Sequence, residues 1–559
     1  MDAEGSAPAA AAIPEPAVSG ERGGLARRAG VVSAAVLASR ILGLVREQTF
    51  ALFFGAGREL DAFITAFRIP NLLRDLFAEG ALSAAFVTTF AQRLTREGEA
   101  SAWHLASLVV NALAVVVGGI TLLGIWFAPA LVHAIAPGFG DIPGKVELTV
   151  HLTRIMFPFL LLIALAAVVM GVLNTRDVFG VPAAASAFFN LGSVVGGVGC
   201  AWLLAPAYLR AAATHGAAAA DHDLAARAMT GMAIGTLFGG LLQLLVQLPS
   251  LRRVGFRYRP VLDPRDRGLH EVLRLMGPAT IGAAAVQVNV LVNNNFASYL
   301  GNGPVSWLNV AFRFMQLPIG MFGVAIGTVT LPLVARQRAQ GDTKGFGSTV
   351  AHALELVGLL CLPAAAGLAL LRVPVIGLIY EHGRFTAADT AAAAQALAGY
   401  AVGLAGYAGI KVLAPAFFAL GDTRTPMLVS LLSITTNYVL NWTFVRALGF
   451  GHLGLALATS AVALGNCGLL YVLLRRRIGP FAAEAGGTLL RIVVATALMA
   501  AAVSAADAAV AGILPAAATA RHALRLAATI PPALAVFWAA CRVLGVALPM
   551  RPGRRRAAR

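Results

Sequence analysis

Residues 39–79 read SRILGLVREQTFALFFGAGRELDAFITAFRIPNLLRDLFAE, and they decide the fold because charged side chains interrupt an apolar segment. These charged side chains include Arg40, Arg46, Asp61, Arg68, Arg74 and Glu79. An arginine at the centre of a membrane helix costs about 2.5 kcal/mol or more, so several arginines persist there only if they face water, each other or a charged ligand. Since the surplus charge is positive, the stretch predicts a cationic cavity that takes an anionic cargo.

The rest of the chain has the composition of a membrane protein. Its 559 residues are 58% hydrophobic and only 12% charged, with a mean hydropathy of +0.78. A soluble protein of this length carries about twice that share of charged residues. Apolar runs long enough to cross about 30 Å of hydrocarbon recur between residues 30 and 545. The sequence therefore predicts an all-α polytopic membrane protein with about fourteen transmembrane helices.

The formal net charge of +17 predicts an orientation in the membrane rather than nucleic-acid binding. No basic soluble domain is present, and the arginines fall mainly in short connections on one side of the predicted topology. On this pattern residues 252–267 and 554–556 lie in the cytoplasm, and residues 138–145 lie on the opposite side. An even number of helices then places both termini in the cytoplasm.

A weak internal repeat predicts two related halves. Ala66-Phe67-Arg68 aligns with Ala311-Phe312-Arg313, and the same offset of about 245 residues places residues 91–93 on 336–338. A six-helix unit repeated in tandem keeps its orientation, so the halves should be related by an axis along the membrane normal. We expect two parallel-repeat six-helix lobes around a central cationic cavity, with two extra C-terminal helices outside the repeat.

These features divide the chain into six predicted parts. They are a disordered cytoplasmic leader (1–29), an N-lobe with helices one to six (30–250), a basic cytoplasmic loop (251–270), a C-lobe with helices seven to twelve (271–477), helices thirteen and fourteen (478–547) and a basic cytoplasmic tail (548–559).

Four arginines are the candidate substrate ligands: Arg40, Arg46, Arg74 and Arg313. Arg40 and Arg46 are six positions apart on one predicted helix, so they differ by about 120° and about 9 Å along its axis. A guanidinium donates two parallel hydrogen bonds to phosphate and stays charged at physiological pH, so four of them would suit a pyrophosphate. The alternative for each is pairing with an acidic residue or reaching out to the membrane interface.

Prolines lie next to two of these arginines. Arg74 follows Pro70, and Arg313 precedes Pro318. A proline in a membrane helix frees a backbone carbonyl and permits a kink, which is tolerated where the backbone lines a cavity.

A second group contains candidate cavity or gating residues: Ser39, Asp61, Arg68 and Glu79. The carboxylates of Asp61 and Glu79 could hold arginines apart, or could separate from them when the lobes move. For Asp61 an equally good alternative is the N-cap of the second helix, after the turn Gly55-Ala56-Gly57.

Neutral oxygens in the second half form a candidate ion site at Asn437, Asn441 and Thr459. The two asparagines are one turn apart and share a helix face. Such oxygens can hold a sodium ion, although hydrogen bonding between helices is the more common role of buried asparagines. The four cysteines have no CxxC spacing, so no metal site is expected.

No enzyme signature occurs in the chain. GxxxxGK[ST], HExxH and GxSxG are all absent from the sequence. We therefore expect a transporter without catalytic residues, without an organic cofactor and without ATP hydrolysis of its own.

Several motifs together resemble the MurJ (MviN) family of lipid II flippases, within the multidrug/oligosaccharidyl-lipid/polysaccharide exporter superfamily. The most specific are SRILGLVRE (39–47), FGAGRELDAFITAFRIPNLLRDLFAEGALSAAFV (54–87), VSWLNVAFRFMQLP (305–318), YEHGRFT (380–386) and KVLAPAFFALGDTRTP (411–426). The resemblance covers roughly residues 30–545.

The resemblance implies that the chain flips lipid II, the undecaprenyl-pyrophosphate-linked peptidoglycan precursor, from the inner to the outer leaflet by alternating access. The family's essential cavity arginines correspond to the four named above, and Asp61 corresponds to its acidic residue. The implied partners are lipid II, the phospholipid bilayer of the bacterial inner membrane and cell-wall synthesis proteins, with no nucleic acid, and the implied state is a monomer. Alternatives within the superfamily are a flippase for another polyprenyl-linked glycan and a drug/ion antiporter.

The resemblance also concerns energy coupling. It implies that the membrane potential or a gradient of Na⁺ or Cl⁻ drives transport. Many relatives carry an acidic residue where this chain has Gln316, and the family's sodium site includes an aspartate where this chain has Asn441. A cage of neutral oxygens attracts a cation less than one with a carboxylate, so we expect sodium dependence to be weak and the potential to dominate.

Overall fold

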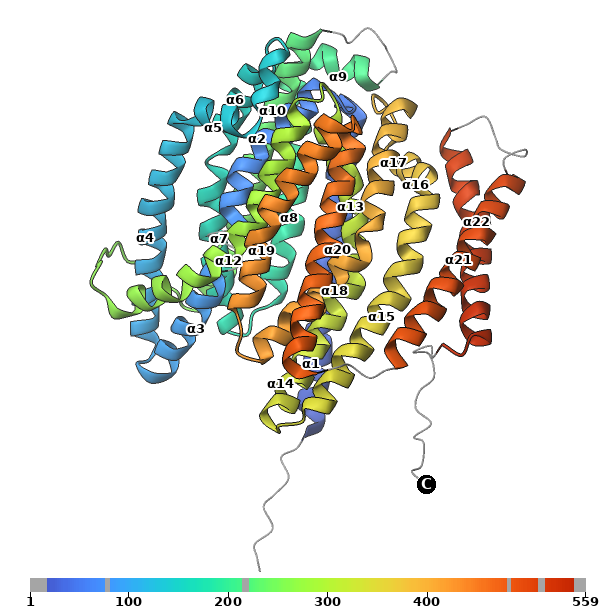
Figure 1. Cartoon of the computed structure of the whole chain (residues 1–559). Coiled ribbons are helices and arrows are strands. Elements are labelled where there is room, and N and C mark those ends of the chain that lie inside the picture. Colours follow the sequence, from blue (N-terminus) through green and yellow to red (C-terminus); the bar gives the residue numbers. More distant parts are fainter. Residues whose placement is uncertain (1–17, 76–80, 214–220, 480–483, 511–517, 547–559) are drawn as a thin grey trace, which may run out of the picture.

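The computed structural model describes residues 18–75, 81–213, 221–479, 484–510 and 518–546, and within these ranges it contains helices and no strands. The long helices run side by side as one bundle (Figure 1). Ten of the described helices are long and apolar enough to cross a membrane, or up to 11 if the bent pair α17 (Ala387–Val402) and α18 (Leu404–Ala419) forms one span. The predicted all-α membrane fold is confirmed, whereas the predicted count of about fourteen spans is not established.

The first half of the chain folds into eleven α-helices and one short 3₁₀ turn among the described residues. They are α1 (Val18–Phe54), α2 (Arg58–Arg74), α3 (Ala81–Arg96), α4 (Glu99–Trp126), α5 (Ala128–Ile135), η2 (Pro137–Asp141), α6 (Lys145–Met156), α7 (Phe159–Thr175), α8 (Gly180–Leu204), α9 (Pro206–Ala213), α10 (His222–Leu245) and α11 (Leu248–Arg253). Glycines let α8 and α10 approach closely: a Cβ on Gly235 would lie 2.2 Å from the Cα of Gly197.

The second half continues the bundle. It comprises α12 (Arg267–Ser298), α13 (Pro304–Pro318), the π-helix η3 (Ile319–Val324), α14 (Ala325–Ala339), α15 (Thr343–Leu370), α16 (Arg372–Tyr380), α17 (Ala387–Val402), α18 (Leu404–Ala419), α19 (Arg424–Asn441), the π-helix η4 (Trp442–Ala447) and α20 (Gly451–Ile478). Two further helices, α21 (Glu484–Val510) and α22 (Ala518–Val543), pack on each other at the edge of the bundle and contact α15 and α16 (Figure 1).

The two predicted proline sites behave differently. Directly after Pro318 the backbone widens into the π-helix η3, as expected for a residue that cannot donate a backbone hydrogen bond. By contrast α2 runs without a break through Pro70 to Arg74. The helix is therefore not broken at Pro70, and Arg74 lies in its last turn.

The predicted boundary between the leader and the first helix differs from the observed one. Helix α1 begins at Val18, so it extends into the predicted leader of residues 1–29. The remainder of that leader, residues 1–17, and the predicted tail, residues 548–559, lie outside the described residues.

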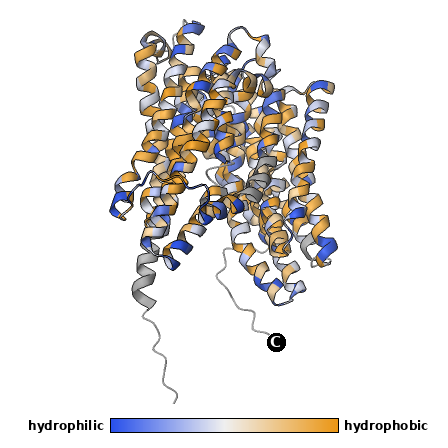
Figure 2. Cartoon of the chain, turned by 90° about the vertical axis from the view of Figure 1, so that its left-hand side faces the viewer, coloured by the Kyte–Doolittle hydropathy of each residue, from blue (hydrophilic) through white to orange (hydrophobic). Residues whose placement is uncertain are grey.

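Polarity follows the helix axes. Hydrophobic residues extend along the helices and hydrophilic residues gather toward their ends (Figure 2). Helix α1 departs from this pattern, because the described part carries Arg40, Arg46 and Glu47. Charges at that depth indicate a helix that lines a polar interior rather than one surrounded by lipid.

Most apolar cores of the bundle belong to one half, but some contain residues of both halves. One core consists mostly of residues from α12 to α20, but Ala51, Ala136 and Phe139 of the first half join it. A second core contains residues of the first half only, from α1, α2, α6, α8, α9 and α10 and from the connection between α8 and α9. These shared residues come from the end of the bundle that carries α5, α6 and α9 (Figure 1). The halves are also in apolar contact elsewhere, because Val272 of α12 shares a core with Leu82 and Phe86 of α3.

Candidate functional site between the two halves

Arg46 lies on α1 with a partly buried side chain. Its guanidinium stands over the ring of Phe189 on α8, 5.2 Å from the ring centroid. Its Nη2 lies 3.6 Å from Oε1 of Glu47, the next residue on the helix. The aromatic face attracts the cation and limits the directions that its planar fork can take. Arg46 is thus pre-oriented by a neutral ring and only loosely held by a carboxylate.

Glu47 joins the two halves. Its Oε1 also forms an ion pair with Nη2 of Arg313 on α13. The Tyr380 hydroxyl, at the end of α16, donates to Oε2 of Glu47 at 3.4 Å. The Glu47 side chain is only 13% exposed, whereas that of Arg313 is 43% exposed. One carboxylate of the first half therefore holds an arginine from each half.

Arg74, at the end of α2, has a carboxylate of its own. Its Nε and Nη2 donate to Oδ1 of Asp75 at 3.2 Å and 2.9 Å. The other oxygen of Asp75 accepts from Nε2 of Gln287 on α12, at 2.9 Å. This contact again bridges the two halves and fixes the direction of the Arg74 fork. Nothing in the sequence pattern singled out Asp75 or Gln287.

The structure gathers three of the four predicted ligands. Arg74 and Arg313 both lie close enough to Arg46 to repel it electrostatically. Three cations in one low-dielectric region favour the entry of an anion that bridges them. Arg40 lies six residues earlier on α1, is exposed, and makes no hydrogen bond or ion pair with the other described residues. It belongs to the same helix but not to the same cluster.

The other predicted cavity residues are scattered. Ser39 is partly buried on α1, and its carbonyl accepts from Nδ2 of Asn190 at 3.1 Å. Arg68 is partly buried on α2 and lies near Tyr400 of α17, across the boundary between the halves. Glu79 lies outside the described residues.

Asp61 is fully buried and acts on the opposite half. Its Oδ1 accepts hydrogen bonds from the backbone N–H and the hydroxyl of Ser306, at 2.9 Å and 2.6 Å. Its Oδ2 accepts from the backbone N–H of Gly303 at 2.7 Å. Gly303 is the N-cap residue of α13, so Asp61 caps a helix of the other half. It does not cap its own helix, whose N-cap is Gly57.

The counter-ion of Asp61 is Lys145 rather than an arginine. The Nζ of Lys145 lies 3.0 Å from Oδ2 of Asp61 and donates to the side chain of Asn302 at 3.0 Å and to the carbonyl of Gly301 at 3.3 Å. Both charged side chains are 0% exposed. The sequence placed Lys145 in a solvent-facing connection. The structure instead buries it at the start of α6, 4.1 Å from the centroid of the Phe139 ring.

Backbone contacts close the same boundary nearby. The connection between α16 and α17 lies on the end of α1, where the N–H of Arg384 donates to the carbonyl of Leu52 at 3.0 Å. A Cβ on Gly383 would lie 2.4 Å from that carbonyl, and its φ of +60° is also left-handed, so only glycine fits. The Arg384 guanidinium donates to the hydroxyl of Tyr208 at 2.8 Å. Backbone and side-chain contacts thus join the halves near the Asp61–Lys145 pair, in addition to the contacts of Glu47 and Asp75 described above.

The candidate ion site is a network of amides inside the second half. Oδ1 of Asn293, on α12, accepts from Nδ2 of Asn437 at 3.0 Å and from Nδ2 of Asn441 at 2.8 Å. Nδ2 of Asn293 donates to the Thr459 hydroxyl at 2.9 Å. The structure thus brings the three predicted residues together around Asn293. The side-chain oxygens of Asn437 and Asn441 are buried and have no hydrogen-bond partner among the described residues. Among those residues no cluster of His, Cys, Asp or Glu could hold a metal.

Comparisons with known sequences agree on one family. The family described as "Lipid II flippase MurJ" matches residues 50–514. A "Probable lipid II flippase MurJ" of Vibrio cholerae serotype O1 is 36% identical over 448 residues, 79% of this chain and 81% of the relative. A "Lipid II flippase MurJ" of Burkholderia cenocepacia is 36% identical over 451 residues, 80% of this chain and 83% of the relative. For a "Probable lipid II flippase MurJ" of Rhizobium meliloti the identity is 35% over 529 residues, 93% of this chain and 94% of the relative.

Solved structures show the same architecture. "Lipid II flippase MurJ, inward closed conformation" superposes with a TM-score of 0.73 and 25% identity, over 92% of this chain and 99% of that one. An inward-facing multidrug resistance MATE family transporter of the MOP superfamily gives a TM-score of 0.65 at 15% identity, over 80% of this chain and 97% of that one. The second likeness concerns the fold alone.

Proposed function

The chain belongs to the MurJ family of lipid II flippases, and on this premise we propose that it moves lipid II from the inner to the outer leaflet of the bacterial inner membrane. The observation that carries the proposal is the ion-pair arrangement at Glu47, which holds Arg46 and Arg313 from opposite halves in one place. The carboxylate of Glu47 occupies the position between these arginines that a phosphate group of the cargo would take.

Binding would be an exchange of anions. A pyrophosphate carries more negative charge than one carboxylate and offers oxygens to two arginine forks at once, so it competes well with Glu47 for Arg46 and Arg313. The freed Glu47 keeps the hydrogen bond from Tyr380. Arg74, steadied by Asp75, adds a third cation near Arg46. The polyprenyl tail stays in the bilayer, because its transfer to a polar cavity would expose apolar surface to water.

Release on the other side requires the halves to separate at the end of the bundle that carries α5, α6 and α9. The contacts to be broken are those of Asp61, Lys145 and the α16–α17 connection. All parts of this cavity come from one chain, so we propose that a monomer suffices. For the driving force we propose the membrane potential, which is worth about 2.3 kcal/mol per elementary charge for each 100 mV.

Complementation tests this function directly. The chain should restore growth to a bacterium depleted of its lipid II flippase, and lipid II should then become accessible to a probe at the outer face. Failure of both, with the protein present in the membrane, would contradict the proposal. Growth without lipid II exposure would favour another polyprenyl-linked glycan, and export of cationic drugs would favour an antiporter.

The orientation makes a further prediction. We propose that the connection before α12 lies in the cytoplasm and that the η2 turn lies in the periplasm, because basic residues concentrate at the first. Cysteines at the exposed positions Arg257 and Asp141, on a background without native cysteines, should react differently with an impermeant maleimide added to intact cells. Labelling is expected at position 141 and absent at 257. The reverse pattern would invert the topology.

The amide network predicts weak sodium binding. Neutral oxygens of Asn437 and Asn441 give a cation no net charge to pair with, so thermal stability and transport should depend little on sodium. The change Asn441→Asp adds a carboxylate beside those oxygens and should create a sodium-dependent rise in the melting temperature that potassium does not reproduce. Asn441→Leu removes the oxygen and is the matched control. Strong sodium dependence of the unchanged protein would contradict the prediction and restore sodium as the coupling ion.

A further inference from the structure

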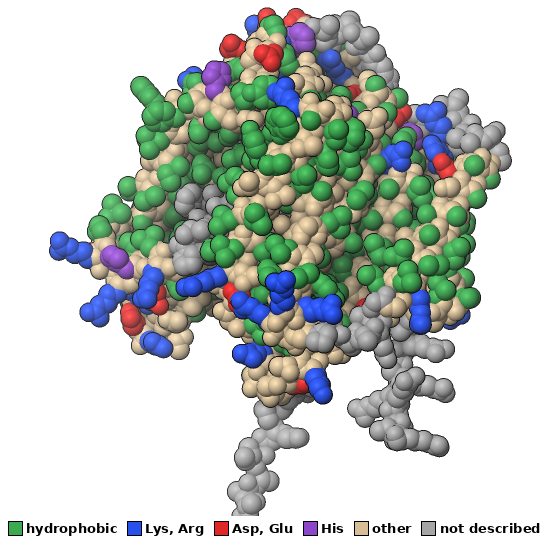
Figure 3. Space-filling model, viewed as in Figure 1, with side chains coloured by type: hydrophobic (Ala, Val, Ile, Leu, Met, Phe, Trp, Pro, Cys, Tyr) green, Lys and Arg blue, Asp and Glu red, His purple; other side chains and the backbone are tan. Residues whose placement is uncertain are grey.

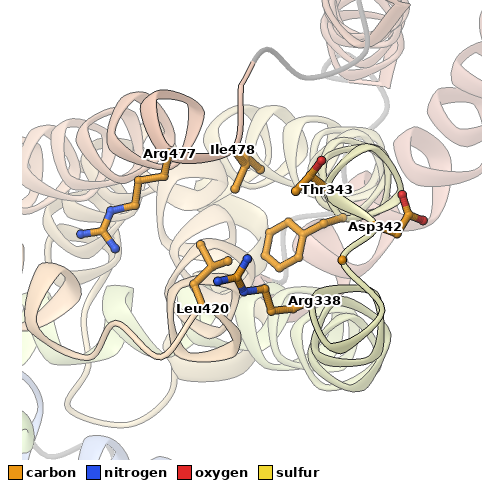
Figure 4. Close-up of a pocket in the computed structure, with 8 residues that line it drawn as sticks. Arg338, Asp342, Thr343, Leu420, Arg477 and Ile478 are labelled. Carbon is orange, nitrogen blue, oxygen red and sulfur yellow. The ribbon is translucent and has the colours of Figure 1, made fainter.

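A cavity of about 260 Å³ lies among helix ends in the second half, remote in sequence from the Glu47 cluster. Phe346 of α15, Leu420 after α18 and Ile478 at the end of α20 give it an apolar floor. Arg338 of α14 and Arg477 of α20 stand at its edge (Figure 4). The cavity therefore combines an apolar surface with the guanidinium of Arg338 and with a second arginine at its edge.

The two arginines differ in freedom. Nη1 of Arg477 is 2.7 Å from Oδ2 of Asp422, and its guanidinium stands over the ring of Phe417 at 5.9 Å. Arg477 is thus anchored but still 49% exposed. Arg338 is exposed, turns toward Leu420 in Figure 4, and has no hydrogen-bond or ion-pair partner among the described residues. Arg477 is therefore held in place, whereas Arg338 is available to bind an anion.

Both nearby carboxylates are already engaged. Oδ1 of Asp342 accepts from the backbone N–H of Gly345 at 2.7 Å, as the cap of α15. Hydrogen bonding from Thr425 and the charge of Arg477 hold the pKa of Asp422 below its ordinary value, so this carboxylate stays ionised and paired.

Basic side chains outnumber these two acids at the helix ends of the second half. The basic residues are Arg336, Arg338, Lys344, Arg424, Arg475, Arg476 and Arg477. Figure 3 shows Lys and Arg side chains gathered along this end of the molecule. The local field therefore attracts anions.

We propose that this cavity binds the phosphate headgroup of an anionic membrane lipid. Its volume lies below the roughly 300–1,000 Å³ of pockets for drug-sized ligands, which suits a headgroup. The helices around it, α15 and α20, are candidate membrane spans, so their ends lie at the membrane surface, where lipid phosphates are concentrated. Arg338 would hold the phosphate, and Arg477, whose guanidinium turns away from the cavity and pairs with Asp422, would add to the positive charge at its edge. Phe346 and Ile478 would contact the glycerol and the first methylenes.

Such a lipid would tie together the ends of four helices, α14, α15, α18 and α20. It would not touch the arginines proposed to bind lipid II, so the two sites can be tested separately. The expected consequence is that an anionic lipid stabilises the second half of the bundle without being transported.

Binding can be measured on the purified full-length protein with short-chain lipids. Dioctanoyl-phosphatidylglycerol should raise the melting temperature, and dioctanoyl-phosphatidylcholine and inorganic phosphate should not do so at the same concentrations. Arg338→Gln should weaken phosphatidylglycerol binding about fivefold, the effect of about one basic contact at a membrane surface. Arg338→Lys should weaken it less, because the charge remains.

The matched control is Arg336→Gln, two residues earlier on the same helix, exposed, and outside the cavity lining. It should leave phosphatidylglycerol affinity within twofold of the unchanged protein. Equal losses at positions 336 and 338 would mean a diffuse charge effect and would overturn the proposed site. Inorganic phosphate that binds as well as the lipid would overturn the assignment to a lipid. If Arg338→Gln lowers the melting temperature without ligand, the phosphatidylglycerol affinities of Arg338→Lys and Arg336→Lys decide instead. A weaker affinity for Arg338→Lys than for Arg336→Lys supports the proposed site, and equal affinities overturn it.

Discussion

Replacement of Arg46 or Arg313 by alanine is expected to abolish lipid II transfer while the protein remains inserted and folded. Each change leaves Glu47 with one guanidinium fewer and removes one fork from the anion site. A hydrogen bond to a charged group contributes about 1.5–3 kcal/mol, so the loss of a bidentate contact lowers affinity by at least tenfold to a hundredfold. Arg74→Ala should also abolish transfer, and the family resemblance predicts the same for Arg40→Ala although Arg40 lies outside the cluster. Externalisation of lipid II in depleted cells measures the effect.

Controls separate charge from structure. Lysine at positions 46 and 313 should restore transfer only in part, because a point charge replaces a planar fork. Arg336→Ala, at an exposed position outside the cluster, should transfer lipid II normally. Normal transfer by all four alanine variants of the proposed ligands would show that these arginines have a structural role only.

Loss of the Asp61–Lys145 pair should have the second large effect. Asp61→Asn leaves the ammonium of Lys145 fully buried without its counter-ion, and breaking a buried pair in this way costs about 3–5 kcal/mol. It also weakens the cap on α13. We expect a lower melting temperature and loss of transfer, because the closed arrangement of this boundary is no longer the stable one.

The double variant Asp61→Asn/Lys145→Gln makes the test specific. It removes both charges together and should recover part of the stability that Asp61→Asn loses, as a double-mutant cycle requires for interacting residues. Asp141→Asn, exposed near the same end of the bundle, is the control and should behave like the unchanged protein. A melting temperature unaffected by Asp61→Asn would rule out a stabilising role for the pair.

The fold and the cationic character of the site follow from composition, because arginines in an apolar chain leave few physical options. The proximity of Asn437 and Asn441 could also be predicted from the sequence, since both lie on one face of one helix. Contacts between residues far apart in the sequence could not be predicted. Lys145 and Asp61 are 84 residues apart, and no periodic pattern links a helix start to a buried carboxylate.

Repeat symmetry misleads in one place. Arg68 and Arg313 occupy equivalent positions in the two halves, yet Arg313 binds Glu47 and Arg68 lies near Tyr400. Equivalent positions in the repeats meet different neighbours because the halves face each other across a boundary that is not symmetric in sequence. The motif alone therefore could not assign their roles.

Helix α13 contacts the first half through two of its residues, and these two contacts restrict how the helix can move. Ser306 is bound by Asp61, and Arg313, bound by Glu47, follows seven residues later. Seven residues are almost two full turns, so both contacts lie on one face of the helix, about 10 Å apart along its axis. A rod held at two such points cannot swing at one end without straining the other. Loss of the contact between Asp61 and Ser306 should therefore also weaken the ion pair of Arg313 with Glu47, and binding of cargo to Arg313 should weaken the contact at Ser306. Such coupling would keep the cavity from opening to both sides of the membrane at once.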